Sequence, residues 1–125
     1  MIHHVSVGTN DVARARRFYD AVLPLVGLRN MHDADVALDY GSGTFVFSVE
    51  TPTDGRPATV GNGSHVAFGV EDRGMVQAFY DAALAHGGSC DGPPGLRPEY
   101  DGNYYGAFVR DPDGNKIEAV TYSAK

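Results

Sequence analysis

The amino-acid sequence predicts an α+β fold built from two copies of one βαβββ module. The first observation is an internal repeat, because residues 4–27 align with residues 65–88 without a gap and ten of the 24 paired positions are identical. Unrelated sequences would share about one or two. Each copy also opens with alternating apolar and polar residues, which indicates a strand, and continues with apolar residues at helical spacing. The glycine content, 16 of 125 residues, is typical of strands joined by tight turns.

The first module spans about residues 1–52 and is expected to hold one helix and four strands. Its opening strand covers residues 4–8, and Asn10 or Asp11 can cap the helix that follows. Gly27 is expected to end this helix, since glycine readily adopts the left-handed conformation found there. Three further strands are expected at residues 28–31, 36–39 and 44–49.

The second module spans about residues 63–125 and repeats this order. Asp72 is expected to cap its helix and Gly88 to end it. Ten additional residues belong to a Gly- and Pro-rich segment, 92–103, which is expected to form a loop long enough to cover a site. A polar linker joins the modules, and together they fit one domain of residues 1–125. The linker covers residues 51–63. The strands of the second module are expected at residues 65–69, 89–91, 105–110 and 116–122.

The composition excludes several classes of function. With 10 basic and 16 acidic side chains, the chain carries a net charge of −6, which argues against nucleic acid and against an anionic membrane surface as partners. A neutral or cationic small molecule, or a metal, fits this charge better. No apolar run approaches the length of a membrane span, and the N-terminus lacks the features of a signal peptide, so we expect a cytoplasmic protein.

Three polar residues share one face of the expected strands. His4 and His65 hold equivalent positions in the two modules, and Glu118 lies in the last strand. Strand alternation directs all three away from the faces that cover the helices. A single histidine on a strand is most often exposed or hydrogen-bonded, but three such residues on one face suit a shared divalent metal. Two imidazoles and one carboxylate also leave coordination positions open for a substrate.

The duplicated module and the segment from Asp111-Pro112-Asp113-Gly114 to Glu118 resemble the vicinal oxygen chelate superfamily, which includes glyoxalase I, bleomycin-resistance proteins and extradiol dioxygenases. The resemblance implies that the modules curve into a partly open barrel of mixed β-sheet with a helix outside each module. It also implies a homodimer, often with ligands from both subunits. One divalent ion, of Zn, Fe, Mn, Ni or Co, would be held by His4, His65 and Glu118, with Glu118 also acting in catalysis.

The resemblance to glyoxalase I is incomplete at a fourth ligand position in the last strand of the first module. Aligning Gly43 with Gly114 places Phe47 opposite Glu118, so no ligand is expected there. We therefore expect a metal-dependent enzyme for a small oxygen-chelating substrate, with lyase, isomerase, transferase and dioxygenase chemistry all open. The alternative is a metal-free protein that sequesters a drug or metabolite. Candidates for the substrate pocket are Phe47, Arg97, Tyr100, Tyr104 and Tyr105, and any of the three tyrosines could be the polar group over the site.

Overall fold

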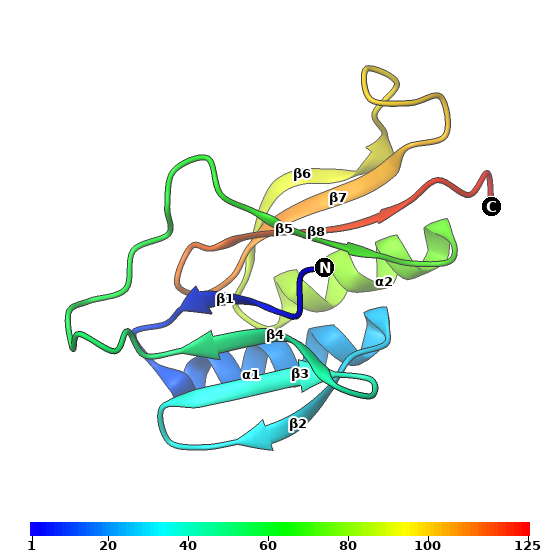
Figure 1. The fold of residues 1–125 in the computed structure, drawn as a ribbon. Coiled ribbons are helices and arrows are strands. Elements are labelled where there is room, and N and C mark those ends of the chain that lie inside the picture. Colours follow the sequence, from blue (N-terminus) through cyan, green and yellow to red (C-terminus); the bar gives the residue numbers. More distant parts are fainter.

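The computed structural model describes residues 1–125 and contains two βαβββ modules (Figure 1). This order of elements confirms the predicted α+β fold class. Neither helix is long and apolar enough to cross a membrane. The first module comprises β1 (Val5–Gly8), α1 (Val12–Val22), the short 3-10 helix η1 (Leu23–Val26), β2 (Arg29–Asp33), β3 (Ala37–Gly41) and β4 (Phe45–Glu50). The second comprises β5 (Val66–Gly69), α2 (Arg73–Ala85), β6 (Ser89–Leu96), β7 (Tyr105–Arg110) and β8 (Lys116–Thr121).

Each module forms its own four-stranded mixed sheet. The strand orders are β1-β4-β3-β2 and β5-β8-β7-β6, so the two sheets have the same topology. In each sheet the first strand pairs in parallel with the last one, and the other pairs are antiparallel. No strand of one sheet pairs with a strand of the other, so the two sheets do not close into a barrel. The arrangement of the two sheets and the two helices is seen in Figure 1.

An aspartate side chain caps the N-terminus of each α-helix. Asp11 accepts a hydrogen bond from the backbone N–H of Arg14 at 3.0 Å, and Asp72 accepts one from Met75 at 2.9 Å. These contacts satisfy backbone donors that a helix leaves free in its first turn. Of the two caps the sequence allowed for the first helix, the structure selects Asp11, while Asn10 contacts the linker instead.

Glycines end the two helical segments in different ways. Gly27 has the left-handed conformation that was expected, with a φ of +90°, but it caps η1, whereas α1 itself ends earlier, at Val22. In the second module Gly87, with a φ of +101°, occupies the left-handed position, so the prediction of Gly88 is wrong by one residue. Gly88 is needed for another reason. A Cβ there would lie 2.8 Å from the carbonyl oxygen of Ala83 and 2.9 Å from that of Arg110.

A single hydrophobic core joins the two modules. It contains 18 buried residues drawn from the inner faces of both helices and from both sheets. The ring centroids of Phe47 and Phe68, one from each module, lie 5.2 Å apart in an edge-to-face arrangement that aromatic pairs favour. Because the helices cover this face of the sheets, the opposite faces are left available for a site.

The turn between β7 and β8 fastens the second module to the first. Asp113 accepts hydrogen bonds from the Thr9 hydroxyl at 2.5 Å and from the Arg14 guanidinium at 2.7 Å. Asp111 is buried and accepts a hydrogen bond from the Tyr19 hydroxyl at 2.6 Å. The side chain of Asn115 donates to the carbonyl oxygen of Gly8 at 2.8 Å. The segment Asp111–Asn115 therefore holds the two modules together, and we call it the latch.

The segment predicted as one long loop, 92–103, is half strand. Strand β6 continues to Leu96, and its pairing with β7 is interrupted by register shifts around Gly92 and Gly95. Pro93 and Pro94 lack the N–H that a central strand needs, but β6 is an edge strand with one partner only. The connection that remains between β6 and β7 is shorter than the sequence suggested.

Candidate functional site

The pairing of strands corrects the expected alignment of the two modules. In the parallel pairs, Val5 is opposite Phe47 and Val66 is opposite Ile117. Since Val5 and Val66 are equivalent, Phe47 corresponds to Ile117, and the expected match of Phe47 with Glu118 is wrong by one residue. Phe47 is fully buried in the core on the helix side of its sheet. The residue that corresponds to Glu118 is Ser48.

A cavity of about 610 Å³ opens on the face of the second sheet that the helices do not cover. Of the residues singled out in the sequence, His65, Arg97, Tyr100, Tyr104 and Glu118 line it. Tyr105 does not, because it packs against the core with the Arg73 guanidinium 4.9 Å from its ring centroid. The complete lining is His65, Asp91, Gly92, Arg97, Tyr100, Tyr104, Phe108, Lys116 and Glu118.

Glu118 is the most deeply buried polar residue of this cavity, with 1% of its side chain exposed. Its Oε1 lies 3.2 Å from Nε2 of His65, and its Oε2 accepts a short hydrogen bond from the Tyr104 hydroxyl. A buried carboxylate is costly unless its oxygens have partners, and here each oxygen has one. The structure therefore brings two of the three predicted ligands together, His65 and Glu118.

Tyr104 is the tyrosine that the structure selects for the site. Burial and its hydrogen bond to Glu118 raise the pKa of the Tyr104 phenol well above its ordinary value. The phenol therefore keeps its proton near neutral pH and can act as a donor toward Glu118. Tyr100 packs edge-on against Tyr104 with 4.9 Å between ring centroids, but 62% of Tyr100 is exposed. Tyr100 thus lies at the rim of the cavity.

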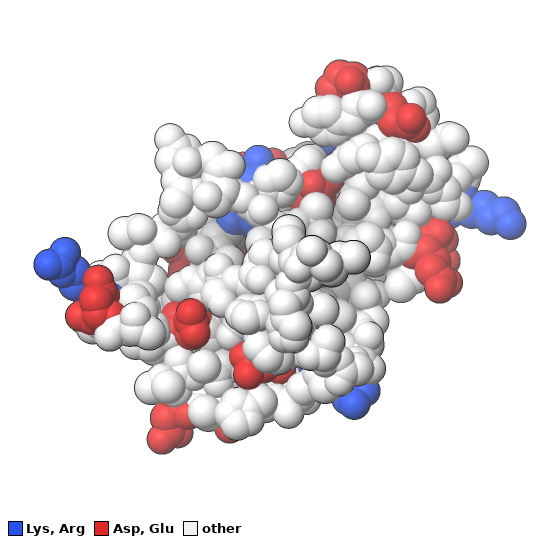
Figure 2. Space-filling model, viewed as in Figure 1, with Lys and Arg blue, Asp and Glu red and all other residues white.

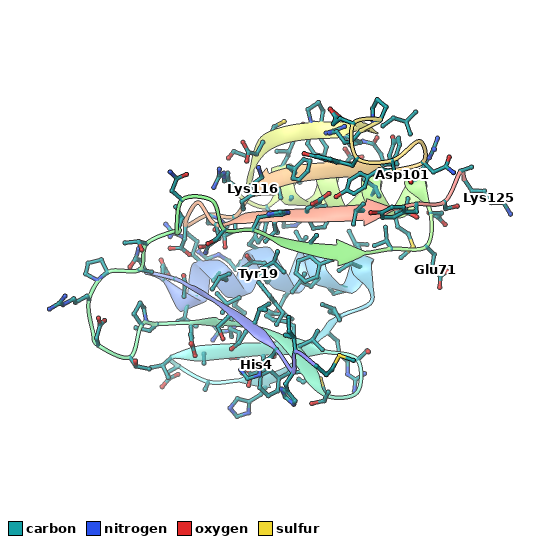
Figure 3. All side chains as sticks on the ribbon, turned by 45° about the horizontal axis from the view of Figure 1, so that its top comes forward. His4, Tyr19, Glu71, Asp101, Lys116 and Lys125 are labelled. Atoms are coloured by element: carbon teal, nitrogen blue, oxygen red, sulfur yellow. The ribbon has the colours of Figure 1, made fainter.

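His4 is not part of this arrangement within one chain. It is exposed just before β1, its ring centroid is 4.6 Å from that of Phe45, and its Nδ1 is 2.8 Å from Nδ1 of His3. Figure 3 shows His4 over the strands of the first module, while Lys116 of the Glu118 cavity lies on the second. No group of three or more His, Cys, Asp or Glu side chains in the chain is arranged to hold a metal.

The first module carries its own polar face. Ser48 donates a hydrogen bond from its hydroxyl to Oδ1 of Asp39 at 2.7 Å, and these residues are cross-strand partners. Asp39 therefore supplies a carboxylate on the face of the first sheet that corresponds to the Glu118 face of the second. Asp39 was not among the residues predicted for a site, because its role depends on the pairing of β3 with β4.

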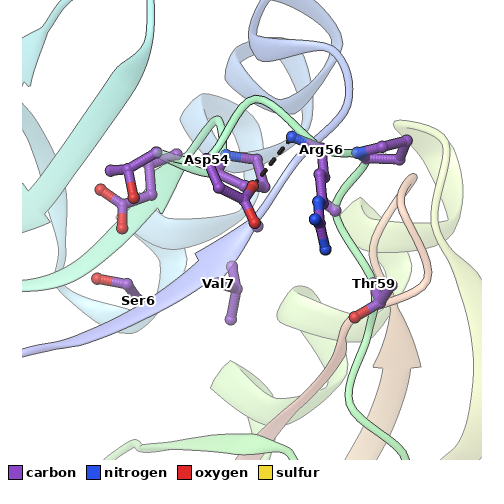
Figure 4. Close-up of a pocket in the computed structure, with 11 residues that line it drawn as sticks. Ser6, Val7, Asp54, Arg56 and Thr59 are labelled. Carbon is purple, nitrogen blue, oxygen red and sulfur yellow. Dashed lines mark hydrogen bonds between the residues drawn. The ribbon is translucent and has the colours of Figure 1, made fainter.

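A second cavity, of about 590 Å³, lies between the first sheet and the linker. Ser6 and Glu50 contribute from β1 and β4, and Asp54 and Arg56 contribute from the linker (Figure 4). The Asp54 carboxylate accepts a hydrogen bond from the backbone N–H of Arg56 at 2.9 Å, which shapes the linker turn. This cavity contains none of the predicted ligands.

Comparison with known proteins decides the family. The profile of the Glyoxalase/Bleomycin resistance protein/Dioxygenase superfamily matches residues 1–119. The chain belongs to this superfamily. This confirms the resemblance to the vicinal oxygen chelate proteins, and the open pair of βαβββ sheets is the architecture of the glyoxalase fold.

Solved and curated relatives agree with this glyoxalase-family assignment. A glyoxalase/bleomycin resistance protein from Albidiferax ferrireducens is 40% identical, with a TM-score of 0.86 over 95% of this chain and 96% of that chain. A protein of Synechocystis named probable lactoylglutathione lyase is 31% identical, covering 98% of this chain and 95% of its own length. A lactoylglutathione lyase of Haemophilus influenzae is 30% identical, covering 95% and 90%.

Within this glyoxalase-family chain, the second module offers the better metal-binding donors. Imidazole and carboxylate are ligands that Zn²⁺ and neighbouring transition metals accept, and His65 and Glu118 present both toward one cavity. The hydrogen bond that the Tyr104 hydroxyl donates to Glu118 is of the kind that orients a carboxylate as a metal ligand. These residues therefore fit a divalent metal, although one chain alone supplies only two of the predicted ligands.

Proposed function

We propose that this protein is a divalent-metal-dependent enzyme of the glyoxalase superfamily that acts on a small substrate with oxygen donors. The observation that supports the proposal most is the contact of His65 and Tyr104 with the two oxygens of the buried Glu118 in one cavity. Relatives named lactoylglutathione lyase make a lyase reaction the first activity to test.

Each residue of the proposed site has a separate role. His65 and Glu118 would hold the ion, which, when bound, supplies Lewis-acid activation of a substrate oxygen. Tyr104 holds the Glu118 carboxylate in position through Oε2 and leaves Oε1 directed toward His65. The Phe108 ring adds an apolar surface to the cavity wall, against which the substrate would pack.

We also propose that a second copy of the chain completes the site. His4 is the pseudo-symmetric equivalent of His65, is exposed, and lies away from the Glu118 cavity of its own chain. In a homodimer that places the first module of one chain against the second module of the other, His4 of the partner subunit can reach the ion. The isologous contact of a two-fold dimer would form two such sites.

The first module offers no carboxylate in the position that corresponds to Glu118. Ser48 stands there, and the nearest carboxylate on that face belongs to Asp39. A reaction that needs a second acidic group would therefore depend on Asp39 of the same subunit that contributes His4.

A metal-free sequestering protein is the second candidate. It is favoured by one observation, namely that no three His, Cys, Asp or Glu side chains of a single chain come together as a set of metal ligands. In that case His65, Glu118 and Tyr104 form a closed hydrogen-bonded group, and ligands bind in the cavity without an ion.

Metal analysis distinguishes the two candidates. Protein purified without chelator, or loaded with Zn²⁺, Fe²⁺, Mn²⁺, Ni²⁺ or Co²⁺, is expected to retain about one ion per chain. His65→Ala and Glu118→Gln should lose most of this ion, because each removes a ligand. His86→Ala is the matched control, since His86 is exposed at the end of α2 and its ring has one hydrogen-bond partner, the carbonyl oxygen of Ala82. Wild-type protein that retains none of these ions would support the metal-free candidate instead.

A further inference from the structure

Two cations flank one aromatic ring in the wall of the Glu118 cavity. The guanidinium carbon of Arg97 lies 5.5 Å from the centroid of the Phe108 ring, and Nζ of Lys116 lies 4.8 Å from it. Both distances are within the range of cation–π attraction. Phe108 thus holds two positive charges beside the same cavity that Glu118 lines.

Arg97 is built into this position. Its Nη2 donates to the carbonyl oxygen of Pro93 at 2.7 Å, which fixes the guanidinium. A Cβ on Gly92 would come within 2.9 Å of the Phe108 ring and 3.3 Å of Nη2 of Arg97, so the glycine leaves the space that the pair occupies. Arg97 has no carboxylate partner in the structure. Its positive charge is therefore not neutralised within the chain.

Lys116 is only partly neutralised. Its Nζ lies 3.5 Å from the Asp91 carboxylate, but the same oxygen is 3.1 Å from Nε of Arg110. One carboxylate is thus shared between two cations. About a third of the Lys116 side chain is exposed, so it can turn toward a ligand. The other carboxylate of the cavity, Glu118, is already engaged by His65 and Tyr104.

We propose that Arg97 and Lys116 bind an anionic oxygen group of the substrate, a carboxylate or a group of similar charge, beside the Phe108 ring. The inference rests on the proposed function, because it names the substrate class of that same site. An anionic substrate also differs from the neutral or cationic ligand that the net charge of −6 suggested. At contact distance the nearby charges dominate, whereas exposed charges beyond about 8–10 Å are screened by salt.

The test uses benzoate and benzamide, which have nearly the same shape but differ in charge. Protein is stripped of metal with a chelator and dialysed, and binding is followed by NMR chemical-shift titration. We expect benzoate to bind about fivefold or more tightly than benzamide, because hydrogen bonds to charged groups are stronger than neutral ones. Arg97→Gln and Lys116→Gln should each weaken benzoate binding about three- to tenfold and leave benzamide unchanged. Arg17→Gln, an equal change of charge at an exposed position on α1, should have no effect.

The outcomes separate this inference from the proposed function. Equal affinity for the two probes, no saturable binding of benzoate, or a preference that survives both substitutions would overturn the anion site. Zn²⁺ binding is measured on the same samples and should not change in the Arg97 or Lys116 variants. A protein that binds Zn²⁺ without preferring benzoate contradicts only the anion site, whereas one that prefers benzoate without binding any metal contradicts only the proposed function.

Discussion

Two buried carboxylates of the second module, Asp111 and Glu118, have very different surroundings. Asp111 accepts hydrogen bonds from the Tyr19 hydroxyl, from the side chain of Asn115 and from the backbone N–H groups of Asp113 and Asn115. Glu118 has only Tyr104 and His65 beside it and lines a cavity. Asp111 is therefore a structural acid with its acceptor capacity in use, whereas Glu118 keeps capacity for a ligand.

The different surroundings of Asp111 lead to a prediction about stability and pH. Asp111→Asn should lower the free energy of unfolding by about 2–3 kcal/mol at pH 7, because an amide nitrogen replaces one acceptor oxygen and faces donors. Burial raises the pKa of Asp111 above the ordinary value of 3.8. Between the unfolded and folded pKa values the folded chain binds more protons, so acidification stabilises the wild type relative to the unfolded chain.

The variant cannot titrate at this position. The difference in unfolding free energy between wild type and Asp111→Asn should therefore grow as the pH falls from 7 toward 4. Urea unfolding at several pH values in this range measures it. A difference that stays constant or shrinks on acidification would show that the pKa of Asp111 is not raised in the folded protein.

Single residues were predictable from the sequence where strand alternation and the repeat agreed. This holds for the shared cavity of His65, directly before β5, and Glu118 in β8, which agrees with strand alternation at both positions. The match of Phe47 with Glu118 was wrong because it relied on aligning turns. The turn between β3 and β4 contains a register shift at Gly41, which a comparison of turn residues cannot reveal.

At the scale of elements, sequence signals located both helices and, to within one residue at each end, the strands β5, β7 and β8 of the second module, but not β6. Aspartate caps and apolar spacing gave both helices, since these are local effects. Strand β6 was predicted too short because its Gly and Pro residues are typical of a loop. Their tolerance in a strand depends on β6 lying at the edge of the sheet, which is a property of the tertiary fold.

The junction between α2 and β6 provides a prediction at this scale. Gly88→Ala should destabilise the protein by about 2–3 kcal/mol, because the new methyl group would meet two backbone carbonyl oxygens and the Phe18 ring, 2.9 Å away. Gly43→Ala is the matched control, since a Cβ there meets nothing within 4 Å. It should change stability by less than about 0.5 kcal/mol. Thermal and urea unfolding of both variants measure the effect, and equal stabilities would contradict the packing described for Gly88.

For the whole molecule, the common core and the Asp111–Asn115 latch fix how the modules sit within one chain. The latch binds the β7–β8 turn to the start of α1, and the core fills the space between the helices and the sheets. This arrangement brings His65 and Glu118 together but leaves His4 on the first module. The repeat made the two histidines equivalent, but it could not say whether equivalent positions meet within a chain or between chains.

The most direct test of a shared metal site uses two complementary variants. His4→Ala and His65→Ala are coexpressed with different affinity tags, and the heterodimer is isolated by purification on both tags. If each site takes His4 from one chain and His65 with Glu118 from the other, one of the two sites in the heterodimer is intact and the other lacks both histidines. We expect each parent homodimer to bind almost no metal and the heterodimer to bind about half the wild-type amount. A heterodimer that binds no more metal than its parents, or the failure of the two chains to associate at all, would contradict a site built between two copies of this chain.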